Sequence, residues 1–350
     1  MQFLLHSRWF DYGTRAPKLT VSFTTWRRAI MLTSVNVRSV IPLPIVVGPT
    51  GSGKSDLAMR IAEAVDGEIV NCDSLQVYRG FDIGTAKVPA PERRGIPHHL
   101  IDVIDPSQLF TAGDYAPMAG AALHEISGRG RIPVLAGGTG FYLRALLDGL
   151  FPGPSRDQAL RTRLELREQR RAGSLHRILK RLDPTAAARI HANDKNKILR
   201  ALEVRLIEGR PLSSLFERGR APLLGFRPIK LGLDPPREEL YAKLNTRTSA
   251  IFERGLLDEV RHLLMAGVSR GAKPFESLGY KQALQVLEGS LTIEQALEST
   301  QIETRRYAKR QLTWFRKEQG VHWLAGFGDD ARMHAEALAI LERERTSIRN

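Results

Sequence analysis

The chain has 350 residues, of which 42% are hydrophobic, and it carries a formal net charge of +14. This length is enough for two domains with a substantial hydrophobic core. No apolar run reaches the roughly eighteen residues of a membrane span, so we expect a soluble, cytoplasmic protein. The single cysteine, Cys72, excludes an intramolecular disulfide and fits a reducing compartment. The positive charge favours a polyanionic partner, most often nucleic acid, and a basic surface that contacts only solvent is the alternative.

Residues 1–40 are a basic leader with one acidic residue, Asp11, and no clear hydrophobic period. We expect it to be disordered or not translated, and two interpretations stay open. Its composition resembles an organelle transit peptide. Alternatively, translation begins at or near Met31, which is the interpretation that we prefer. The leader supplies five of the fourteen excess charges, so about nine remain on the rest of the chain and the nucleic-acid inference stands without it.

A phosphate-binding loop follows the apolar run Ile45–Val47 and leads into a helix over 56–62. Its residues are Gly48, Pro49, Thr50, Gly51, Ser52, Gly53, Lys54 and Ser55. Glycines let successive backbone N–H groups converge on one anion, and the helix N-terminus adds partial positive charge. In this context Lys54 would reach outer phosphate oxygens and the Ser55 hydroxyl would bind magnesium. The motif alone leaves open whether the ligand is a nucleoside triphosphate or another diphosphate.

Short apolar strands alternate with helices through the first half of the chain. Beyond the strand before the phosphate-binding loop, we expect strands over 67–71, 99–104 and 132–136. This alternation is typical of a P-loop NTPase-like α/β fold, with a parallel sheet and helices on both faces. Asp73 and Thr139 follow two of these strands, so we expect them to share one crevice with the phosphate-binding loop.

One feature of nucleotide-hydrolysing P-loop proteins is missing from the expected place. Such proteins usually have an apolar strand that ends in Asp, which holds magnesium and positions water. Here the strand over 132–136 ends in Gly137, Gly138, Thr139 and Gly140. This ending points away from a motor or a switch, although Asp102 and Asp105 keep that alternative open.

The domain boundaries follow from changes in this pattern. We expect a P-loop α/β core over 41–153 and 226–325, interrupted by a helical insertion over 154–225 and followed by a polar helical tail over 326–350. The helices expected in the insertion are 157–172, 175–182, 186–190 and 195–208. The arginines of its first helix are either a solvated helix face or a binding surface. When the core resumes, we expect a strand over 229–233 and helices over 237–252 and 256–265.

The helix expected over 300–318 is the most basic in the chain. It interleaves Tyr307, Trp314 and Phe315 with arginines and lysines, which suits a polynucleotide surface of cations and stacking side chains. The alternative is that the aromatic side chains face the core and only the basic face is exposed. The two interpretations are compatible.

An ordered set of motifs over about 45–325 closely resembles the bacterial tRNA dimethylallyltransferases. The segments that carry the resemblance are 72–87, 97–99, 102–106, 137–142, 189–191, 193–194, 200–204, 279–281 and 309–315. The resemblance implies transfer of a dimethylallyl group from dimethylallyl diphosphate to the exocyclic amine of the adenosine 3′ of the anticodon. It also implies that the P-loop holds the diphosphate of the donor, which explains the missing aspartate without ATP hydrolysis.

The resemblance implies roles for individual residues. Asp73 would take the proton from the attacking amine. Thr139, Arg247, Lys54 and the magnesium ion on Ser55 would stabilise the departing diphosphate. The residues implied in tRNA binding are Asp73, Ser74, Leu75, Gln76, Thr139, Arg161, Asn196, Lys197, Ile198, Leu199, Arg200, Glu276, Ser277, Leu278, Gly279, Tyr280 and Lys281. Magnesium would be the cofactor, tRNA and dimethylallyl diphosphate the substrates, and we expect a monomer.

Three other functions stay open at this point. A small-molecule P-loop kinase would need ATP turnover and would gain nothing from the basic helix. An RNA-binding ATPase would use that helix but not Asp73. A related enzyme that prenylates free adenine nucleotides is disfavoured by the helical insertion. We expect Cys72 to be a small buried hydrophobe and assign no metal to His98 and His99, because they lack partners at metal-ligand spacing.

Overall fold

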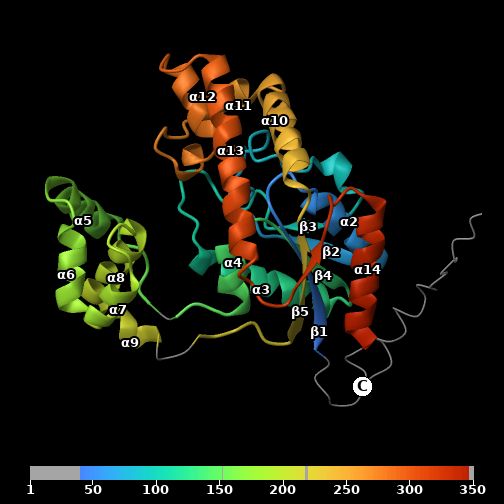
Figure 1. Ribbon diagram of the computed structural model, residues 1–350, viewed down its shortest axis with the longest axis horizontal. Coiled ribbons are helices and arrows are strands. Elements are labelled where there is room, and N and C mark those ends of the chain that lie inside the picture. Colours follow the sequence, from blue (N-terminus) through green and yellow to red (C-terminus); the bar gives the residue numbers. More distant parts are fainter. Residues whose placement is uncertain (1–39, 152, 217–219, 347–350) are drawn as a thin grey trace, which may run out of the picture. The chain divides into compact units, whose positions relative to one another are not determined.

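The computed structural model describes residues 40–151, 153–216 and 220–346, so nearly all of the expected basic leader lies outside the described residues. Six strands form one parallel sheet in the order β3-β2-β4-β1-β5-β6 (Figure 1). The strands are β1 (Ile41–Val47), β2 (Gly67–Asn71), β3 (His98–His99), β4 (Ile132–Ala136), β5 (Phe226–Leu233) and β6 (Val321–Leu324). The predicted parallel α/β sheet is therefore confirmed.

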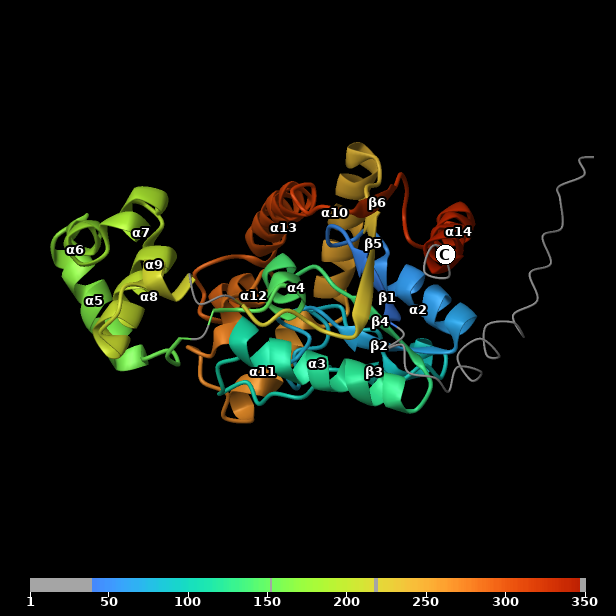
Figure 2. The same cartoon turned by 90° about the horizontal axis from the view of Figure 1, so that it is seen from below.

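Helices cover both faces of the sheet (Figure 2). On one face, α3 (Ala112–Gly128) and α4 (Gly140–Leu147) pack on alternate apolar residues of β1, β2 and β4 in the largest hydrophobic cluster. On the other face lie α2 (Lys54–Val65) and α14 (Ala331–Thr346), which pack against each other. Burial on both faces explains why these strands are continuous apolar runs in the sequence.

Three strands differ in length from the prediction, one of them β5, which begins at Phe226 and not at residue 229. The first strand begins at Ile41 and not at Ile45. Prolines 42 and 44 therefore lie inside it, where they pair with β5. The third was expected over 99–104 but ends at His99. The chain leaves the strand there because Leu100 and Asp102 have φ of 60° and 57°, in the left-handed region that no regular strand contains. The predicted extent of that strand is wrong, although a strand of the parallel sheet does lie there.

The insertion forms a helical cluster with its own hydrophobic core, which includes Leu179, Leu199 and Leu202. Its helices are α5 (Gln158–Arg170), α6 (Ser174–Leu182), α7 (Pro184–Arg189), α8 (Lys195–Glu208) and α9 (Leu212–Phe216). Asp157 and Asp194 cap α5 and α8 by accepting backbone N–H bonds, as their positions before an apolar period indicate. The four longer helices match the prediction to within a few residues, and α9 was not predicted.

The chain then returns to the sheet and continues in helices. These are α10 (Arg237–Glu253), α11 (Leu256–Met265), α12 (Tyr280–Leu287) and the long α13 (Ile293–Phe315), with short 3₁₀ turns η1 (Ala90–Arg93) and η2 (Lys273–Glu276) elsewhere. The tail is less polar in its packing than the sequence indicated, since α14 buries Met333, Ala337, Ile340 and Leu341. Among the described residues, no helix combines the length and the apolar character needed to cross a membrane.

Candidate active site

The phosphate-binding loop connects β1 to α2 and is held from outside by the C-terminal segment. Gly51 and Gly53 have φ of 76° and 85°, which favours glycine. A Cβ on Gly53 would lie 2.8 Å from the backbone nitrogen of Gly328. That nitrogen donates a hydrogen bond to the Ser52 carbonyl at 2.8 Å. The loop is therefore fixed by a contact with a segment some 275 residues away, in addition to its own turn geometry.

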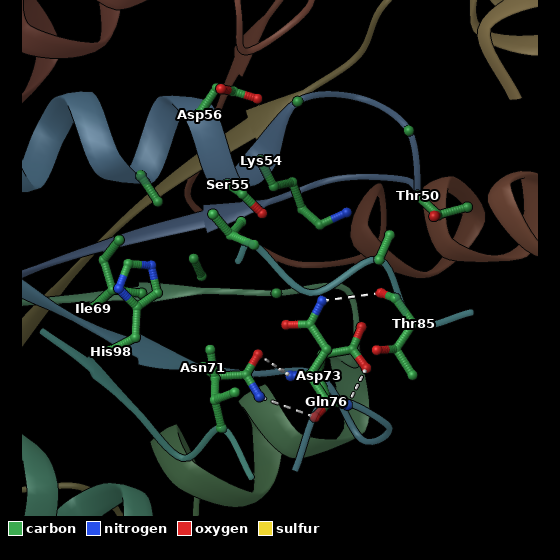
Figure 3. Close-up of a pocket in the computed structure, with 18 of the residues that line it drawn as sticks. Thr50, Lys54, Ser55, Asp56, Ile69, Asn71, Asp73, Gln76, Thr85 and His98 are labelled. Atoms are coloured by element: carbon green, nitrogen blue, oxygen red, sulfur yellow. Dashed lines mark hydrogen bonds between the residues drawn. The ribbon is translucent and has the colours of Figure 1, made fainter. Parts of the chain in front are cut away.

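Lys54, the first residue of α2, points toward the cavity beside this loop (Figure 3). Its Nζ donates to the Pro49 carbonyl at 2.8 Å. Burial lowers the pKa of Lys54 to about 8; the charge of Asp73 opposes this shift and that of Arg247 adds to it. Since no carboxylate of the described residues forms an ion pair with it, this partly desolvated ammonium group is ready to bind an anion.

Arg247 extends from α10 into the same cavity. Burial lowers its pKa, Asp73 raises it, and Arg254 lowers it further. Within the described ranges, Arg247 has no hydrogen bond or ion pair to another residue. Since an unpaired desolvated guanidinium is costly, this arrangement also indicates a site for a negatively charged ligand.

Asp73 lies across the cavity from Lys54, just after β2 (Figure 3). Its Oδ1 accepts hydrogen bonds from the backbone of Leu75 at 2.8 Å and of Gln76 at 3.4 Å, and its own N–H donates to Asn71 Oδ1 at 3.1 Å. These bonds hold the carboxylate in one orientation. Its Oδ2 accepts no hydrogen bond within the part of the chain that the structure describes, and it is therefore available as a proton acceptor.

Thr139 follows β4 and lies against the loop after β2. Its Oγ1 accepts from the Ser74 backbone N–H at 3.1 Å, and its own N–H donates to the Cys72 carbonyl at 3.2 Å. Gly137 allows this approach, because a Cβ there would lie 2.1 Å from the Cys72 carbonyl oxygen. Cys72 itself is buried, and desolvation raises the pKa of its thiol to about 12, as expected for a small buried hydrophobe.

The structure thus brings the predicted site residues of three strand ends together. Lys54, Ser55, Asp73 and Arg247 line one cavity of about 250 Å³, and Thr139 bonds to the residue next to Asp73. The cavity is also lined by residues that the sequence analysis had not assigned to the site: Asn71, Thr85, Ala86, Val88, His98 and Ile101. Burial lowers the pKa of His98, and its Nδ1 contacts the Ile96 carbonyl at 2.8 Å.

Gln311 lies on α13, in the middle of the expected basic helix, and no individual role was predicted for it. Its side chain is buried and contacts the backbone of both the phosphate-binding loop and the loop after β4. Both partners are more than 170 residues away along the chain, so no local pattern marks this residue. The resemblance to a known family covers it only as one letter of a motif.

Arg161 is placed differently from the expectation of an RNA contact. It is buried in the insertion and forms two hydrogen bonds with Glu203, each of 2.9 Å. Arg200 donates to the same carboxylate at 2.8 Å. Although burial opposes ionisation of Glu203, bonds from Arg161, Arg200 and the Asp157 backbone lower its pKa to about 2. In the structure Arg161 therefore acts inside the insertion, because a buried carboxylate needs a cation.

Tyr280 is also inside the protein and not on a binding surface. Its ring is fully buried, and its hydroxyl donates to Glu259 and accepts from the Gly84 backbone at 3.1 Å. Glu259 accepts in turn from the Ile83 backbone at 2.7 Å. Tyr280 thus positions the loop that brings Thr85 to the cavity.

The remaining residues implied in tRNA binding fall into three groups by exposure. Ile198, Leu199 and Gly279 are buried, so the side chains of the first two belong to the insertion core. Ser74, Leu75, Gln76, Arg200, Ser277 and Leu278 are half-buried. Asn196, Lys197, Glu276 and Lys281 are exposed. Only the last two groups present side chains that a macromolecule can reach.

The aromatic and basic side chains of α13 separate onto different faces. Phe315 is buried, and Tyr307 and Trp314 are half-buried, with Arg144 stacked 4.6 Å from the Trp314 ring centre. The exposed basic residues are Arg306, Lys309 and Arg310 on the helix and Arg316 and Lys317 just after it. The structure agrees with the alternative interpretation for Phe315, which faces the core, and leaves an exposed basic face. Binding of a polynucleotide to that face stays a prediction.

The donor set of the cavity restricts how it can hold a metal ion. Within the described ranges, no group of three or more His, Cys, Asp or Glu side chains is arranged to bind one. The cavity is lined by the exposed Ser55 and by Asp56 at the start of α2, and by the Asp73 carboxylate on the opposite wall. Such a sparse set fits magnesium, which commonly takes most of its ligands from substrate phosphates and water.

Fold and cavity together define a P-loop α/β protein whose cavity is lined by two cations, Lys54 and Arg247, and by two acidic residues, Asp56 and Asp73. A family profile described as IPP transferase matches residues 76–318. The chain belongs to the IPP transferase family.

Individual relatives agree with this assignment. A tRNA dimethylallyltransferase of Solibacter usitatus is 62% identical over 298 residues, which cover 85% of this chain and 97% of the relative. The crystal structure of a tRNA isopentenylpyrophosphate transferase from Bacillus halodurans is similar with 36% identity and a TM-score of 0.64, over 88% of this chain and 99% of that one. A eukaryotic dimethylallyltransferase acting on tRNA is 29% identical with a TM-score of 0.72, over 87% and 80% of the two chains.

Proposed function

We propose that this chain transfers the dimethylallyl group of dimethylallyl diphosphate to the exocyclic amine of the adenosine 3′ of the anticodon, position 37 of tRNA. The products are N6-isopentenyladenosine and diphosphate. One observation carries the proposal: Lys54 and Arg247, two partly desolvated cations with no carboxylate ion pair among the described residues, line the same cavity as the oriented carboxylate of Asp73. A transfer from a diphosphate to an amine needs cations for the leaving diphosphate and a base for the proton of the amine.

The chemistry assigns a role to each wall of the cavity. As the C1–O bond of the donor breaks, its electron pair stays with the leaving diphosphate, whose growing charge Lys54, Arg247 and the P-loop N–H groups stabilise. Thr139 is proposed to contribute a hydroxyl on the same side. The adenine nitrogen forms the new N–C bond and loses its proton to Asp73. Because the cations gain most when charge develops on the diphosphate, they favour the transition state over the bound substrate.

Magnesium fits this site through Ser55, and we propose that the ion is held there together with the diphosphate. It would supply additional positive charge next to the leaving group. The P-loop amides, Lys54 and Arg247 are oriented by the fold itself, so they bind and position the diphosphate whatever the occupancy of the metal position.

We further propose that the tRNA contacts come from two regions, and that the insertion over 154–225 is one of them. Its exposed Asn196 and Lys197 belong to the implied RNA-binding set, and α13 adds an exposed basic face. A base stacked in the anticodon loop must leave the stack to reach a carboxylate inside a cavity, at a cost of a few kcal/mol. We expect the enzyme to act as a monomer, which sedimentation of the protein with and without tRNA will test.

The function is tested by incubating the purified protein with unmodified tRNA, radiolabelled dimethylallyl diphosphate and magnesium, with ATP omitted. Label is expected in the tRNA, at the adenosine 3′ of the anticodon. A parallel reaction with free AMP in place of tRNA tests the nucleotide-prenylating alternative. Phosphate release from ATP without any transfer to tRNA would contradict the proposal and support a P-loop kinase or ATPase.

A further inference from the structure

Gln311 joins two loops of the active site through its side-chain amide. Its Oε1 accepts a hydrogen bond from the Thr50 backbone N–H at 2.8 Å, and its Nε2 donates to the Gly138 carbonyl at 2.9 Å. The side chain is only 6% exposed, so these bonds do not compete with bulk water. Gln311 thus connects the phosphate-binding loop with the loop after β4.

The orientation of this amide is fixed by its partners. Its oxygen faces a backbone N–H donor and its nitrogen faces a backbone carbonyl acceptor. If the amide were turned over, its NH₂ group would face the Thr50 N–H and its oxygen would face the Gly138 carbonyl, so neither hydrogen bond could form. The partner loop is shaped to receive it as well, since a Cβ on Gly138 would lie 2.3 Å from Gln311 Nε2. A bulkier residue at position 138 would have to displace the amide.

The two loops contribute to different parts of the proposed reaction, because one holds the diphosphate and the other contacts the segment that carries Asp73. Thr50 belongs to the loop that holds the diphosphate, and Gly138 immediately precedes Thr139, whose hydroxyl bonds to the backbone next to Asp73. We propose that Gln311 is a positioning residue, which sets the spacing between the leaving diphosphate and the side of the site that receives the adenine amine. This inference rests on the proposed function. A misplacement of about 1 Å between reacting groups can reduce the rate about 100-fold.

Two substitutions separate positioning from simple packing. Gln311→Met keeps the length of the side chain but removes both hydrogen bonds, and we expect kcat to fall about 100-fold while the Kd for tRNA stays within about twofold. Gln311→Glu offers a sharper test. A protonated carboxyl group accepts from Thr50 and donates to Gly138 as the amide does, whereas a carboxylate cannot donate. The ratio of Gln311→Glu to wild-type kcat is therefore expected to rise as the pH falls from 8 to 6.

Gln301 provides the matched control, because it lies on the same helix and, among the described residues, its Nε2 donates only to the Asn245 carbonyl, at 3.4 Å, away from both loops. Gln301→Met and Gln301→Glu are expected to keep wild-type kcat at every pH. If Gln311→Met does not fold, Gly138→Ala tests the same contact from the other side and should lower kcat without weakening tRNA binding. An active wild type with unchanged kcat and a flat pH ratio in the Gln311 variants would overturn the inference, whereas an inactive wild type would overturn the proposed function instead.

Discussion

Two clusters of positive charge, one buried in the insertion and one lining the cavity of the α/β core, are built in opposite ways. In the insertion, Arg161 meets the fully buried Glu203 through two hydrogen bonds. In the core, Lys54 and Arg247 face a cavity, and neither has a carboxylate within ion-pair distance among the described residues. The first cluster is complete within the fold. The second lacks a negative partner, which a bound diphosphate would supply.

This difference separates structural from functional cations. Removing one member of a complete buried pair leaves an uncompensated charge and destabilises the fold. Removing a cation that has no partner relieves a desolvation cost, so stability is kept while ligand binding is lost. The sequence alone does not distinguish the two, because Arg161 and Arg247 lie in similar helical surroundings and both match a family pattern. The partners of Arg161 and Arg247 in the structure distinguish the structural cation from the functional one.

The largest effect is expected for Asp73→Asn, which keeps the shape of the residue but removes the base. We expect kcat to fall by about 10²–10⁴-fold, as for other general bases. The Kd for tRNA and the melting temperature should change little, because Oδ1 of the amide still accepts the bonds from Leu75 and Gln76. Single-turnover transfer with bound tRNA measures the chemical step. Loss of tRNA binding with the chemical step intact would show that Asp73 is structural.

Arg161→Met is expected to have the next largest effect, but on stability. Leaving Glu203 buried without this partner should lower the free energy of unfolding of the insertion by about 3–5 kcal/mol, measured by urea denaturation. Arg163→Met is the control, since Arg163 is exposed on the same helix and its loss should cost less than about 0.5 kcal/mol. The double variant with Glu203→Met should recover much of the stability. Equal stability of the Arg161 and Arg163 variants would contradict the distinction drawn between the two clusters.

Arg247→Met tests the cavity cluster, in which removal of a cation is expected to reduce activity and not stability. We expect a fall in kcat of about 10²–10³-fold, the usual cost of removing a group that stabilises transition-state charge. The melting temperature should stay the same or rise, because no ion pair is broken. Arg254→Met, at the end of the same helix and exposed, should change neither quantity. A large drop in melting temperature for Arg247→Met would assign this residue to the structural group.

Short-range patterns made most of the fold predictable. The phosphate-binding loop, β2, β4, α8 and α11 lie where the sequence indicated, because turn glycines, caps and apolar periods act over a few residues. Contacts distant in sequence explain most of what was missed. The third strand is cut short by the left-handed Leu100 and Asp102, and Lys87 holds Asp102 there through an ion pair. Prolines hid the start of the first strand, and the packing of α14 is not evident from its many charges.

The candidate site shows the same limit. The placement of Asp73 and the phosphate-binding loop at one sheet edge follows from parallel topology alone. Arg161 pairs with Glu203, which is 42 positions away. Gln311 connects two loops that lie more than 170 positions away from it. Since neither contact has a local signature, a motif can indicate that such residues matter but not whether they bind substrate or support the fold.

A smaller effect, on stability at acid pH, also distinguishes the two clusters. The pKa of Glu203 is lowered from 4.5 to about 2, so its contribution to stability is present above pH 4.5 and is lost as the pH falls through 2. Urea denaturation of the insertion at pH 5, 4 and 3 should show a declining free energy of unfolding. The decline attributable to this group should disappear in Glu203→Gln, and Glu165→Gln, on an exposed residue, should leave it unchanged. An identical decline in both variants would remove Glu203 from the explanation.

The smallest effect is expected at alkaline pH in the core. Because the pKa of Lys54 is lowered to about 8, the free enzyme loses this positive charge above that pH, while Arg247 stays protonated. The kcat/KM for dimethylallyl diphosphate, which reports the free enzyme, should fall by up to about tenfold per pH unit beyond this value. Bound diphosphate raises the pKa of Lys54 again, so kcat at saturating donor should change much less. In Lys54→Arg the charge persists, so the alkaline fall should flatten even though the altered side chain lowers the absolute rate; an unchanged alkaline limb in that variant would mean that another group titrates.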